Sequence, residues 1–588
     1  MMHKISYLLR LLLPFILCLH LLTTTVSGID QWCHKTPYPD PCKRYFENRN
    51  GFRLPTQLSD FRVMLVEAAM HRALSARDAL ANSALNYTTG CPKQAVFADC
   101  IHLYGDTIMQ LNRTLECVSG KQYCTDFDAQ TWLSTALTNT YTCRHGTTDL
   151  NVPDFITPIV SDTETSNLIS NCLAVNGALA NNNGATTTTA DRKGFPTWVS
   201  GKESRLLQLQ SERDVRANLV VAKDGSGHVT TVQAAIDVAG RRKVASGRFV
   251  IYVKRGVYQE NINVRRNNDD IMLVGDGIGS TIITAGRSVK DGYTTYSSAT
   301  AGIEGLHFIA KGITFQNTAG PAKGQAVALR SSSDLSIFYQ CSIEGYQDTL
   351  LVHSQRQFYR DCYIYGTVDF IFGNAAVVFQ NCLILPRRPL KGQANVITAQ
   401  GRAGPFQNTG ISIHNSTILP APDLMPVIGT VKTYMGRPWM KYSRTVVLET
   451  YLDSVVSPLG WSPWLKGSDF GLDTLFYAEY NNTGPASPTS GRVRWKGFHV
   501  LNRASDASAF TVGSFIAGTS WLPGTDQKET QQSEASRTIM KLKIRIKFPF
   551  SIDDAERWTC CLHEIKKGKC LKIFTRQSKA DMRGRRDD

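Results

Sequence analysis

The sequence of 588 residues lacks the cysteine and histidine patterns that hold metal ions. None of its 15 cysteines stands in a C-x-x-C pair, and its 12 histidines are scattered instead of clustering with cysteine at zinc-site spacing. We therefore predict no metal site. The segment GDGIGS at 275–280 lacks the full spacing of a phosphate-binding loop, so its glycines are interpreted as corners of the backbone. We predict no cofactor.

Long hydrophobic runs are also missing, apart from one near the N-terminus. Residues 1–28 carry Lys4 and Arg10 ahead of an apolar run of about a dozen residues and then small residues, which is typical of a secretory signal peptide. The run is short for a permanent membrane span, and it contains Pro14 and His20. These features favour a cleaved signal over a membrane anchor.

The cysteines that are present favour an oxidising compartment. Cys33 and Cys42 close a tight loop, and Cys100 and Cys143 are candidates to staple neighbouring helices, although the sequence alone leaves the pairing open. Triplets for N-linked glycosylation point the same way, at Asn86, Asn112, Asn415 and Asn481. We expect a secreted, extracellular protein.

Negatively charged residues are fewer than positively charged ones, with 49 Asp and Glu against 65 Lys and Arg, so the formal net charge is +16. For a secreted protein, an acidic polysaccharide is a more sensible partner than nucleic acid. Part of the excess lies in residues 526–588, which show no strand periodicity. We interpret this segment as a flexible basic tail, or as a stretch outside the working protein, rather than as a nucleic-acid arm.

Residues 29–180 show the spacing of amphipathic helices. One apolar stripe has a 4-3-4-3 spacing, at Phe97, Ile101, Tyr104, Ile108 and Leu111. Three further stripes contain Val66, Leu133 and Leu168, and Ser161-x-x-Glu164 has the pattern of a capping box. Four stripes with short connections predict an antiparallel four-helix bundle.

Residues 181–204 separate this bundle from the rest of the chain. The stretch NNNGATTTTADRKG is polar and low in complexity, so we interpret it as a linker. The following GKESRLLQLQSERD is either a proteolytic processing site or more solvated linker. The sequence leaves these two alternatives open.

From residue 218 onward the chain follows a strand pattern that repeats. Short apolar units alternate like strands, and Cys341, Cys362 and Cys382 recur at intervals of 21 and 20 residues. A period of 20–25 residues with glycine-rich turns predicts a parallel β-solenoid in which each unit is one coil. Equivalent positions on consecutive coils then lie one strand spacing apart, about 4.8 Å.

Two acidic residues share this period, because Asp348 and Asp369 are 21 positions apart. If they stack, their like charges oppose simultaneous ionisation, so that one carboxyl serves as an acid and the other as a nucleophile. The alternative is that each aspartate only caps a turn. Nearby groups that favour chemistry are amide donors, a guanidinium and an indole, at Gln347, Gln325, Arg437 and Trp439.

At these positions the sequence resembles the plant pectinesterases (pectin methylesterases) that carry an N-terminal invertase/pectin methylesterase inhibitor-like domain. The motifs that carry the resemblance are GVYQE at 256–260, DGYTTYSSAT at 291–300, GITFQNTAGP at 312–321, QAVALR at 325–330, GYQDTL at 345–350, DFIFG at 369–373 and GRPW at 436–439. LSTALTNTYTC at 133–143 resembles the inhibitor-type bundle. The resemblance implies a right-handed parallel β-helix for residues 205–525, methyl-esterified pectin as substrate and the cell wall as location.

The resemblance also implies roles for individual residues. Asp369 matches the family's nucleophile and Asp348 its proton donor and later base, while Gln325 and Gln347 match the glutamines that stabilise the transition state. The substrate-contacting positions match Thr295, Gln325, Arg437 and Trp439. Tyr346 and Trp461 are further candidates for a sugar platform, with core packing as the alternative. The family's catalytic-domain disulfide corresponds to Cys362–Cys382.

Two other classes of function fit the sequence less well. An inverting polysaccharide hydrolase needs carboxyl groups roughly 6.5–9.5 Å apart, wider than one coil, and a calcium-dependent lyase needs several clustered acids. A non-enzymatic binder, in which the helical domain docks a partner or masks the cleft, is a second alternative. The sequence leaves open whether the bundle is removed or inhibits within the same chain.

Overall fold

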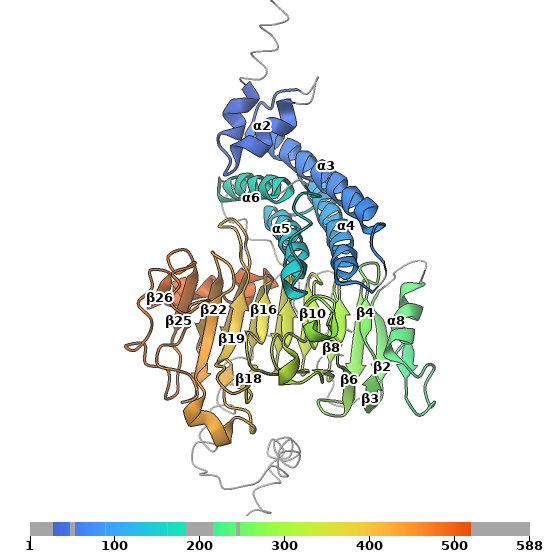
Figure 1. Ribbon diagram of the computed structural model, residues 1–588, viewed down its shortest axis with the longest axis vertical. Helices are drawn as coiled ribbons and strands as arrows, with labels where there is room; N and C mark the ends of the chain where they lie inside the picture. The colour runs from blue at the N-terminus through green and yellow to red at the C-terminus, as the bar shows by residue number, and fades with distance from the viewer. Residues whose placement is uncertain are drawn as a thin grey trace, which may run out of the picture.

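The computed structural model describes residues 28–47, 53–88, 90–160, 163–182, 216–242 and 247–518. The predicted signal peptide apart from Gly28, most of the predicted linker, the basic tail and Ser161 of the predicted capping box lie outside these described residues. Within them, a bundle of helices stands on one face of a long stack of parallel strands (Figure 1). No helix in the described ranges is both long enough and apolar enough to span a bilayer.

The N-terminal part of the chain is helical. Its helices are α2 (Pro39–Glu47), α3 (Leu58–Ala84), α4 (Pro92–Val118), α5 (Asp126–Asp149) and α6 (Glu164–Asn182). The long helices α3 to α6 pack around a core that includes the fully buried Phe61, Phe97, Leu133 and Leu168. This arrangement confirms the predicted helical bundle.

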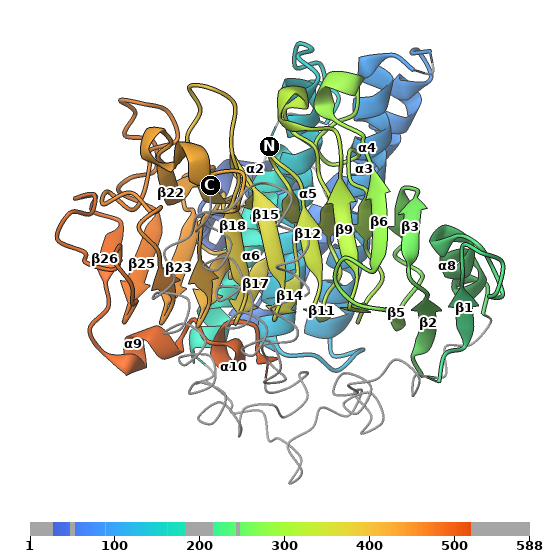
Figure 2. The same cartoon turned by 90° about the horizontal axis from the view of Figure 1, so that it is seen from below.

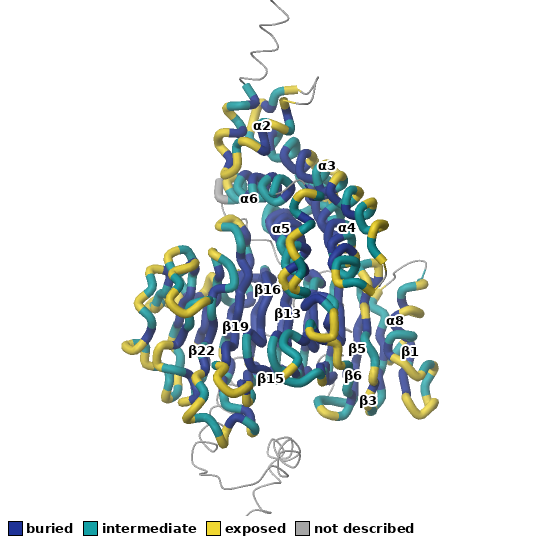
Figure 3. The backbone as a smooth tube through the Cα atoms, in the orientation of Figure 1, coloured by how far each residue is buried: buried dark blue, intermediate teal, exposed yellow. Residues whose placement is uncertain are grey.

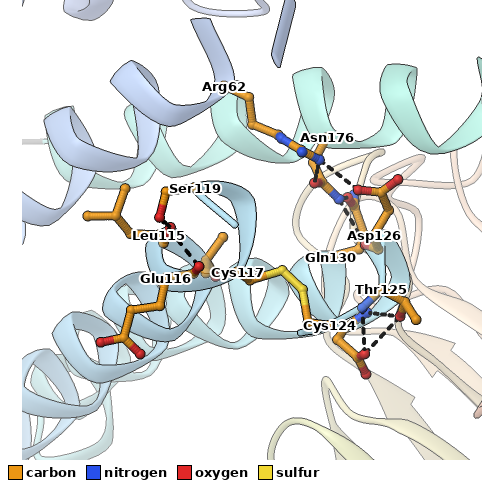
Figure 4. Close-up of a disulfide and its surroundings, with 12 residues drawn as sticks. Arg62, Leu115, Glu116, Cys117, Ser119, Cys124, Thr125, Asp126, Gln130 and Asn176 are labelled. Carbon is orange, nitrogen blue, oxygen red and sulfur yellow. Dashed lines mark hydrogen bonds and ion pairs between the residues drawn. A yellow bond between two sulfur atoms is a disulfide. The ribbon is translucent and has the colours of Figure 1, made fainter. Parts of the chain in front are cut away.

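Local signals and disulfides fix the ends of these helices. A capping box starts α5, because Thr125 Oγ1 accepts the Asp128 N–H (3.1 Å) and Asp128 Oδ2 accepts the Thr125 N–H (3.0 Å). Disulfides join Cys33 to Cys42 and Cys100 to Cys143. A third, which sequence reasoning did not pair, joins Cys117 to Cys124 across the exposed turn between α4 and α5 (Figure 4).

The C-terminal part is a parallel β-helix built from three sheets (Figure 2). Sheet A contains β1 (Leu219–Val221), β2 (Phe249–Val253), β5 (Ile271–Gly275), β8 (Ile309–Lys311), β11 (Ser336–Tyr339), β14 (Arg356–Arg360), β17 (Ala376–Gln380), β20 (Gly410–His414), β23 (Arg444–Leu448), β25 (Phe476–Tyr480) and β26 (Phe498–Val500). Sheet B contains β3 (Gly256–Gln259), β6 (Thr281–Ala285), β9 (Thr314–Asn317), β12 (Ser342–Glu344), β15 (Tyr363–Gly366), β18 (Leu383–Pro386), β21 (Thr417–Ile418) and β24 (Tyr451–Leu452). Sheet C contains β4 (Ile262–Val264), β7 (Ala301–Ile303), β10 (Leu329–Ser331), β13 (Leu350–Val352), β16 (Ile371–Gly373), β19 (Asn395–Gln400) and β22 (Thr433–Pro438).

Each of the central coils contributes one strand to each sheet, so like residues stack along the solenoid. Leu350 pairs with Leu329 on one side and with Ile371 on the other. Aromatic rings stack in the same way, with centroid separations of 4.6 Å between Phe338 and Tyr359 and 4.8 Å between Tyr359 and Phe379. The predicted solenoid is confirmed, and its core consists of such columns.

Short helices cover the ends and one side of the solenoid. α8 (Val232–Gly240) packs on β1, β2 and β4, while α9 (Ala504–Ser508) and α10 (Val512–Phe515) follow the last strand, and α10 packs on β17. The 3₁₀ helices η2 (Val289–Asp291), η3 (Pro321–Lys323) and η4 (Met425–Thr430) lie in turns between strands. Further along sheet C, the outward side chains Leu351, Phe372 and Ala399 pack in the apolar cluster of the bundle instead.

The cysteine column corrects one expectation. Cys341, Cys362 and Cys382 each precede a strand of sheet B whose first residues pair with one another, so the three are stacked. All three are buried and free, and the disulfide predicted between Cys362 and Cys382 is not formed in this structure. Instead, the Cys362 thiol donates to the carbonyl of Phe338 (3.3 Å) and the Cys382 thiol to that of Tyr359 (3.6 Å), each on the preceding coil.

Candidate active site

Two aspartates occupy equivalent turns on neighbouring coils. Asp348 lies two residues before β13 and Asp369 two residues before β16, and the Asp348 N–H donates to the carbonyl of Val368 (3.0 Å). Both have a left-handed backbone, with φ of 60° and 51°. Few residues other than glycine adopt this conformation, and aspartate is among those that tolerate it best. The turn therefore places both side chains on the same edge of sheet C.

One of the two carboxylates is paired with a guanidinium. Arg437 in β22 donates from Nε to Asp369 Oδ1 (2.8 Å) and from Nη2 to Asp369 Oδ2, which is a two-pronged ion pair. The same guanidinium stacks over the ring of Trp464, 4.3 Å from its centroid. Arg437 is thus held in place while it binds Asp369.

The surroundings shift the pKa values of the Asp348 and Asp369 carboxyls by different amounts. Burial and the negative charges of Asp369 and Asp149 raise the pKa of Asp348 well above its usual range. Burial also raises the pKa of Asp369, but the hydrogen bonds and charge of Arg437 act against this rise. The pKa of Asp348 is therefore raised more than that of Asp369, because Arg437 favours the charged form of Asp369.

The predicted amide donors lie on adjacent coils near this pair. Gln347 directly precedes Asp348, and its carbonyl accepts the N–H of Ala326, the residue after Gln325 (3.2 Å). Both glutamines are partly exposed. The structure therefore brings Gln325, Gln347, Asp348 and Asp369 into one region at the start of the sheet C strands.

Of the predicted sugar-binding aromatic residues, Trp439 and Tyr346 are partly exposed and Trp461 is buried. Trp439 follows β22 and is partly exposed, and its ring lies 5.9 Å from that of Phe372. By contrast, Trp461 is 1% exposed and packs on Tyr477 with ring centroids 4.4 Å apart, so it is a core residue. Tyr346 lies under the guanidinium of Arg387, 4.0 Å away.

The bundle covers this region. The carboxylate of Asp149, the last residue of α5, accepts the backbone N–H of Thr295 (2.9 Å). On α4, Asp99 accepts a hydrogen bond from the hydroxyl of Thr294. The ring of His145 lies 5.0 Å from that of Trp439. Two of the predicted substrate-binding residues therefore contact the bundle.

Helix α5 is buried along most of its length (Figure 3). Its contacts with the β-helix are rich in side-chain hydrogen bonds: Thr142 with His353 (2.9 Å), Thr138 with Asn374 (2.8 Å), the Ser134 carbonyl with Gln407 (3.1 Å) and Thr131 with Asn408 (2.9 Å). Leu351 and Phe372 of sheet C belong to the same apolar cluster as Leu133 and Leu137 of α5. The outer face of β13 and β16 is thus closed to solvent.

The hydroxyl groups of α5 have a second partner inside their own helix. Thr131, Thr135, Thr138 and Thr142 each donate to the backbone carbonyl four residues earlier, at 2.8–3.0 Å. These residues therefore satisfy a hydrogen bond whether or not the β-helix is in contact.

Sequence reasoning missed the acidic residues of this contact and a buried ion pair near it. Glu304 binds Arg330 (2.9 Å) within the β-helix and His102 of α4 (2.9 Å). Tyr296 donates to the same carboxylate (3.1 Å), and the pKa of Glu304 is lowered by His102 and Arg330 against the effect of burial. A possible signal was the charge balance, since acidic residues on the predicted helices face a basic solenoid.

Comparison with protein families decides the identity of both parts. The family model described as Pectinesterase matches residues 218–519, which is half of the chain. The chain belongs to the pectinesterase family. The model described as Plant invertase/pectin methylesterase inhibitor matches residues 27–175, the region of the helical bundle.

Individual relatives agree with this assignment. The chain is 78% identical over 531 residues to "Probable pectinesterase/pectinesterase inhibitor 59" of Arabidopsis thaliana, covering 89% of this chain and 98% of the relative. It is 50% identical over 528 residues to "Pectinesterase 2" of Citrus sinensis, covering 88% and 98%. Among solved structures, pectin methylesterase from carrot matches with a TM-score of 0.50 and 52% identity, covering 57% of this chain and 98% of that one.

Family membership settles the class of reaction. A pectinesterase is a carboxylic ester hydrolase that acts on the methyl esters of pectin, so the depolymerase and binder alternatives are not supported. It also agrees with the fold, because the carrot enzyme aligns with the β-helical part of the chain.

Proposed function

We propose that Asp369 is the nucleophile of this pectinesterase and that Asp348 is its general acid and base. Asp369 attacks the carbonyl carbon of a galacturonate methyl ester, and Gln325 and Gln347 donate hydrogen bonds to the oxyanion. The proton on Asp348 passes to the methoxy oxygen as the C–O bond breaks and methanol leaves. Asp348 then takes a proton from water, whose oxygen attacks the acyl-enzyme and releases Asp369.

The single observation that supports this assignment is the unequal environment of two carboxyls at equivalent turns of neighbouring coils. Arg437 pairs with Asp369 through two hydrogen bonds, whereas Asp348 is buried beside two negative charges. A nucleophile must be ionised and a general acid must be protonated at the same pH, and this difference provides both. Thr295 and Trp439 are proposed to bind the sugars that flank the reacting ester.

We propose further that the bundle keeps the chain latent. Asp149 and His145 contact the two residues assigned to sugar binding, and α5 covers the outer face of β13 and β16. A polymer cannot reach the aspartates while these contacts persist. The predicted signal peptide and the cell-wall substrate support secretion to the extracellular space, where the bundle would be displaced or removed.

Methanol release from esterified pectin tests the residue roles. In the opened Asp128→Arg chain described below, Asp369→Asn is expected to lower the rate by at least about 10³-fold, because both the covalent step and its partner acid lose their function. Asp361→Asn is the matched control, since Asp361 has a similar left-handed backbone (φ 54°) but lies before sheet B instead of sheet C. Near-normal methanol release by Asp369→Asn would overturn the assignment.

The same assay of methanol release tests whether the bundle keeps the intact chain inactive. Asp128→Arg places a like charge against Arg356, which it now binds at 2.7 Å, and should loosen the bundle. We expect methanol release by the uncleaved chain to rise at least tenfold, and Asp369→Asn in this background should abolish the gain. An unchanged rate, with the chain shown intact by mass spectrometry, would contradict latency.

A further inference from the structure

Two arginines of the β-helix bind carboxylates of the bundle. Arg266, two residues after β4, donates from Nε to Asp106 of α4 (2.9 Å). Arg356, at the start of β14, donates from Nη1 to Asp128 of α5 (2.7 Å). Neither arginine belongs to the proposed catalytic machinery.

Arg356 is held by its own domain. Its Nε and Nη2 bind the two oxygens of Asp334 (2.9 and 2.8 Å), and Asp334 also accepts the backbone N–H of Arg356 (3.1 Å). This pairing lowers the pKa of Asp334 to about 2. The β-helix alone therefore fixes the position of the guanidinium. Its third nitrogen, Nη1, points to the bundle and binds the carboxylate there.

The two arginines share one edge of sheet C. Arg266 follows the end of β4 and Arg356 follows the end of β13, and parallel strands end at the same edge. β4 and β13 are three strand positions apart in the sheet, roughly 14 Å at the usual spacing. Asp348 and Asp369 lie at the opposite edge, before β13 and β16. A polymer that crosses the sheet from the aspartates can thus reach these cations.

The bundle is an imperfect partner for this edge. Arg113 of α4 is buried against the ring of Trp132 (4.3 Å), where burial and the charge of Arg356 lower its pKa. In the part of the chain that the structure describes, Arg113 Nη1, Gln110 Oε1 and Asn139 Oδ1 are buried without a hydrogen-bond partner. Buried polar atoms that lack partners weaken a contact, so a better-fitting polycarboxylate can compete with the bundle.

We propose that Arg266 and Arg356 form a binding site for the carboxylates of de-esterified galacturonan, which Asp106 and Asp128 occupy in the latent chain. This inference rests on the function proposed above, because hydrolysis converts neutral esters into carboxylates. Hydrolysis in one region of the polymer yields carboxylates that displace the bundle. The active site therefore becomes accessible where pectin already carries free acid groups. The ligand binds only the open state and shifts the chain toward it by mass action.

The test measures binding of a fully de-esterified oligogalacturonate to the full-length protein by titration calorimetry. A neutral galactose oligomer of equal length is the control ligand. We expect Asp106→Asn with Asp128→Asn to raise the affinity for the oligogalacturonate at least tenfold, because the arginines lose their carboxylate partners on the bundle. Arg266→Gln with Arg356→Gln should lower it at least tenfold, and binding to wild type should weaken as salt is added.

Each outcome has a defined meaning. A gain in the aspartate variant supports the site even if the arginine variant unfolds, which thermal melting detects. Equal affinity in wild type and the aspartate variant, or equal binding of the neutral oligomer, would overturn the inference. Methanol release from esterified pectin by the opened Asp128→Arg chain keeps the two proposals separate, since it persists if only the carboxylate site is wrong.

Discussion

The core of the β-helix and the contact between the two domains differ in chemistry. The core consists of stacked apolar columns such as Leu329, Leu350 and Ile371, whose neighbours repeat from coil to coil. The contact with α5 consists largely of hydroxyl, amide and charged groups. Contacts between domains that move apart are typically more polar than a domain core. The comparison indicates that the β-helix core is permanent, whereas the contact between the two domains can separate.

The largest expected effect contrasts glycines of the two domains. A methyl group on Gly366 would lie 2.1 Å from Phe370 Cβ and 2.8 Å from Thr349 Oγ1, beside the turns that carry the aspartates. Gly366→Ala should therefore destabilise the β-helix by about 3 kcal/mol. Gly105→Ala on α4 meets no atom within 4 Å and should stabilise the bundle by about 0.5–1 kcal/mol.

Calorimetric unfolding of the full-length variants checks this pair. Effects of the same sign in both variants would contradict the view that the β-helix core is tightly packed at Gly366 while α4 has free space at Gly105.

The next effect concerns pH and the domain contact. Burial raises the pKa of Asp149 to about 6 in the docked chain, from an ordinary value near 4. The docked chain therefore binds a proton at Asp149 more tightly than the undocked chain does. Docking is strongest below about pH 4 and weakens as the pH rises to about 6. Asp149→Asn should remove this contribution, because the amide stays neutral.

Other groups at the contact titrate as well, so the comparison is made between variants. Burial lowers the pKa of His145 to about 4, which opposes docking as pH falls, and Asp99 has a raised pKa. His145 and Asp99 are present in both wild type and Asp149→Asn, so the difference between the two chains reflects Asp149 and the effect of its charge on neighbours such as Asp348. The ratio of wild-type to variant methanol release should rise between pH 4 and 6. A ratio independent of pH would show that Asp149 does not control docking.

The smallest effect concerns a helix cap in each domain. Thr125→Ala removes the capping box of α5 and should lower the stability of the bundle by about 1 kcal/mol. Thr511→Ala, at the start of α10 beside the β-helix, removes no side-chain cap and should change stability by less than about 0.5 kcal/mol. Equal losses would indicate that the Thr125 hydroxyl is not stabilising as a cap. Chemical denaturation of the two variants measures the difference.

Much of the fold and of the proposed dyad follows from local repetition in the sequence. The 21-residue interval places Asp348 and Asp369 on neighbouring coils because each coil returns to the same three sheets. Repetition also stacks Cys362 and Cys382, yet the disulfide that the family resemblance implied between them is not formed. Repetition fixes which residues are neighbours, but it does not fix whether they react.

The domain contact had no such signal. Asp149 and Asp128 are ordinary helix residues in the sequence, and their partners Thr295 and Arg356 lie far away along the chain. Such contacts depend on how two finished domains fit together, which neither periodicity nor spacing encodes. Trp461 illustrates the same limit, because an aromatic residue near the site motifs is in fact packed inside the solenoid.

The threonine ladder of α5 has a consequence for the fate of the molecule after the domains part. Each hydroxyl already donates to a carbonyl of its own helix, so exposing that surface to water leaves none of these donors without a partner. The freed helix therefore keeps these hydrogen bonds in solution, although separation also exposes the apolar side chains of Leu133 and Leu137.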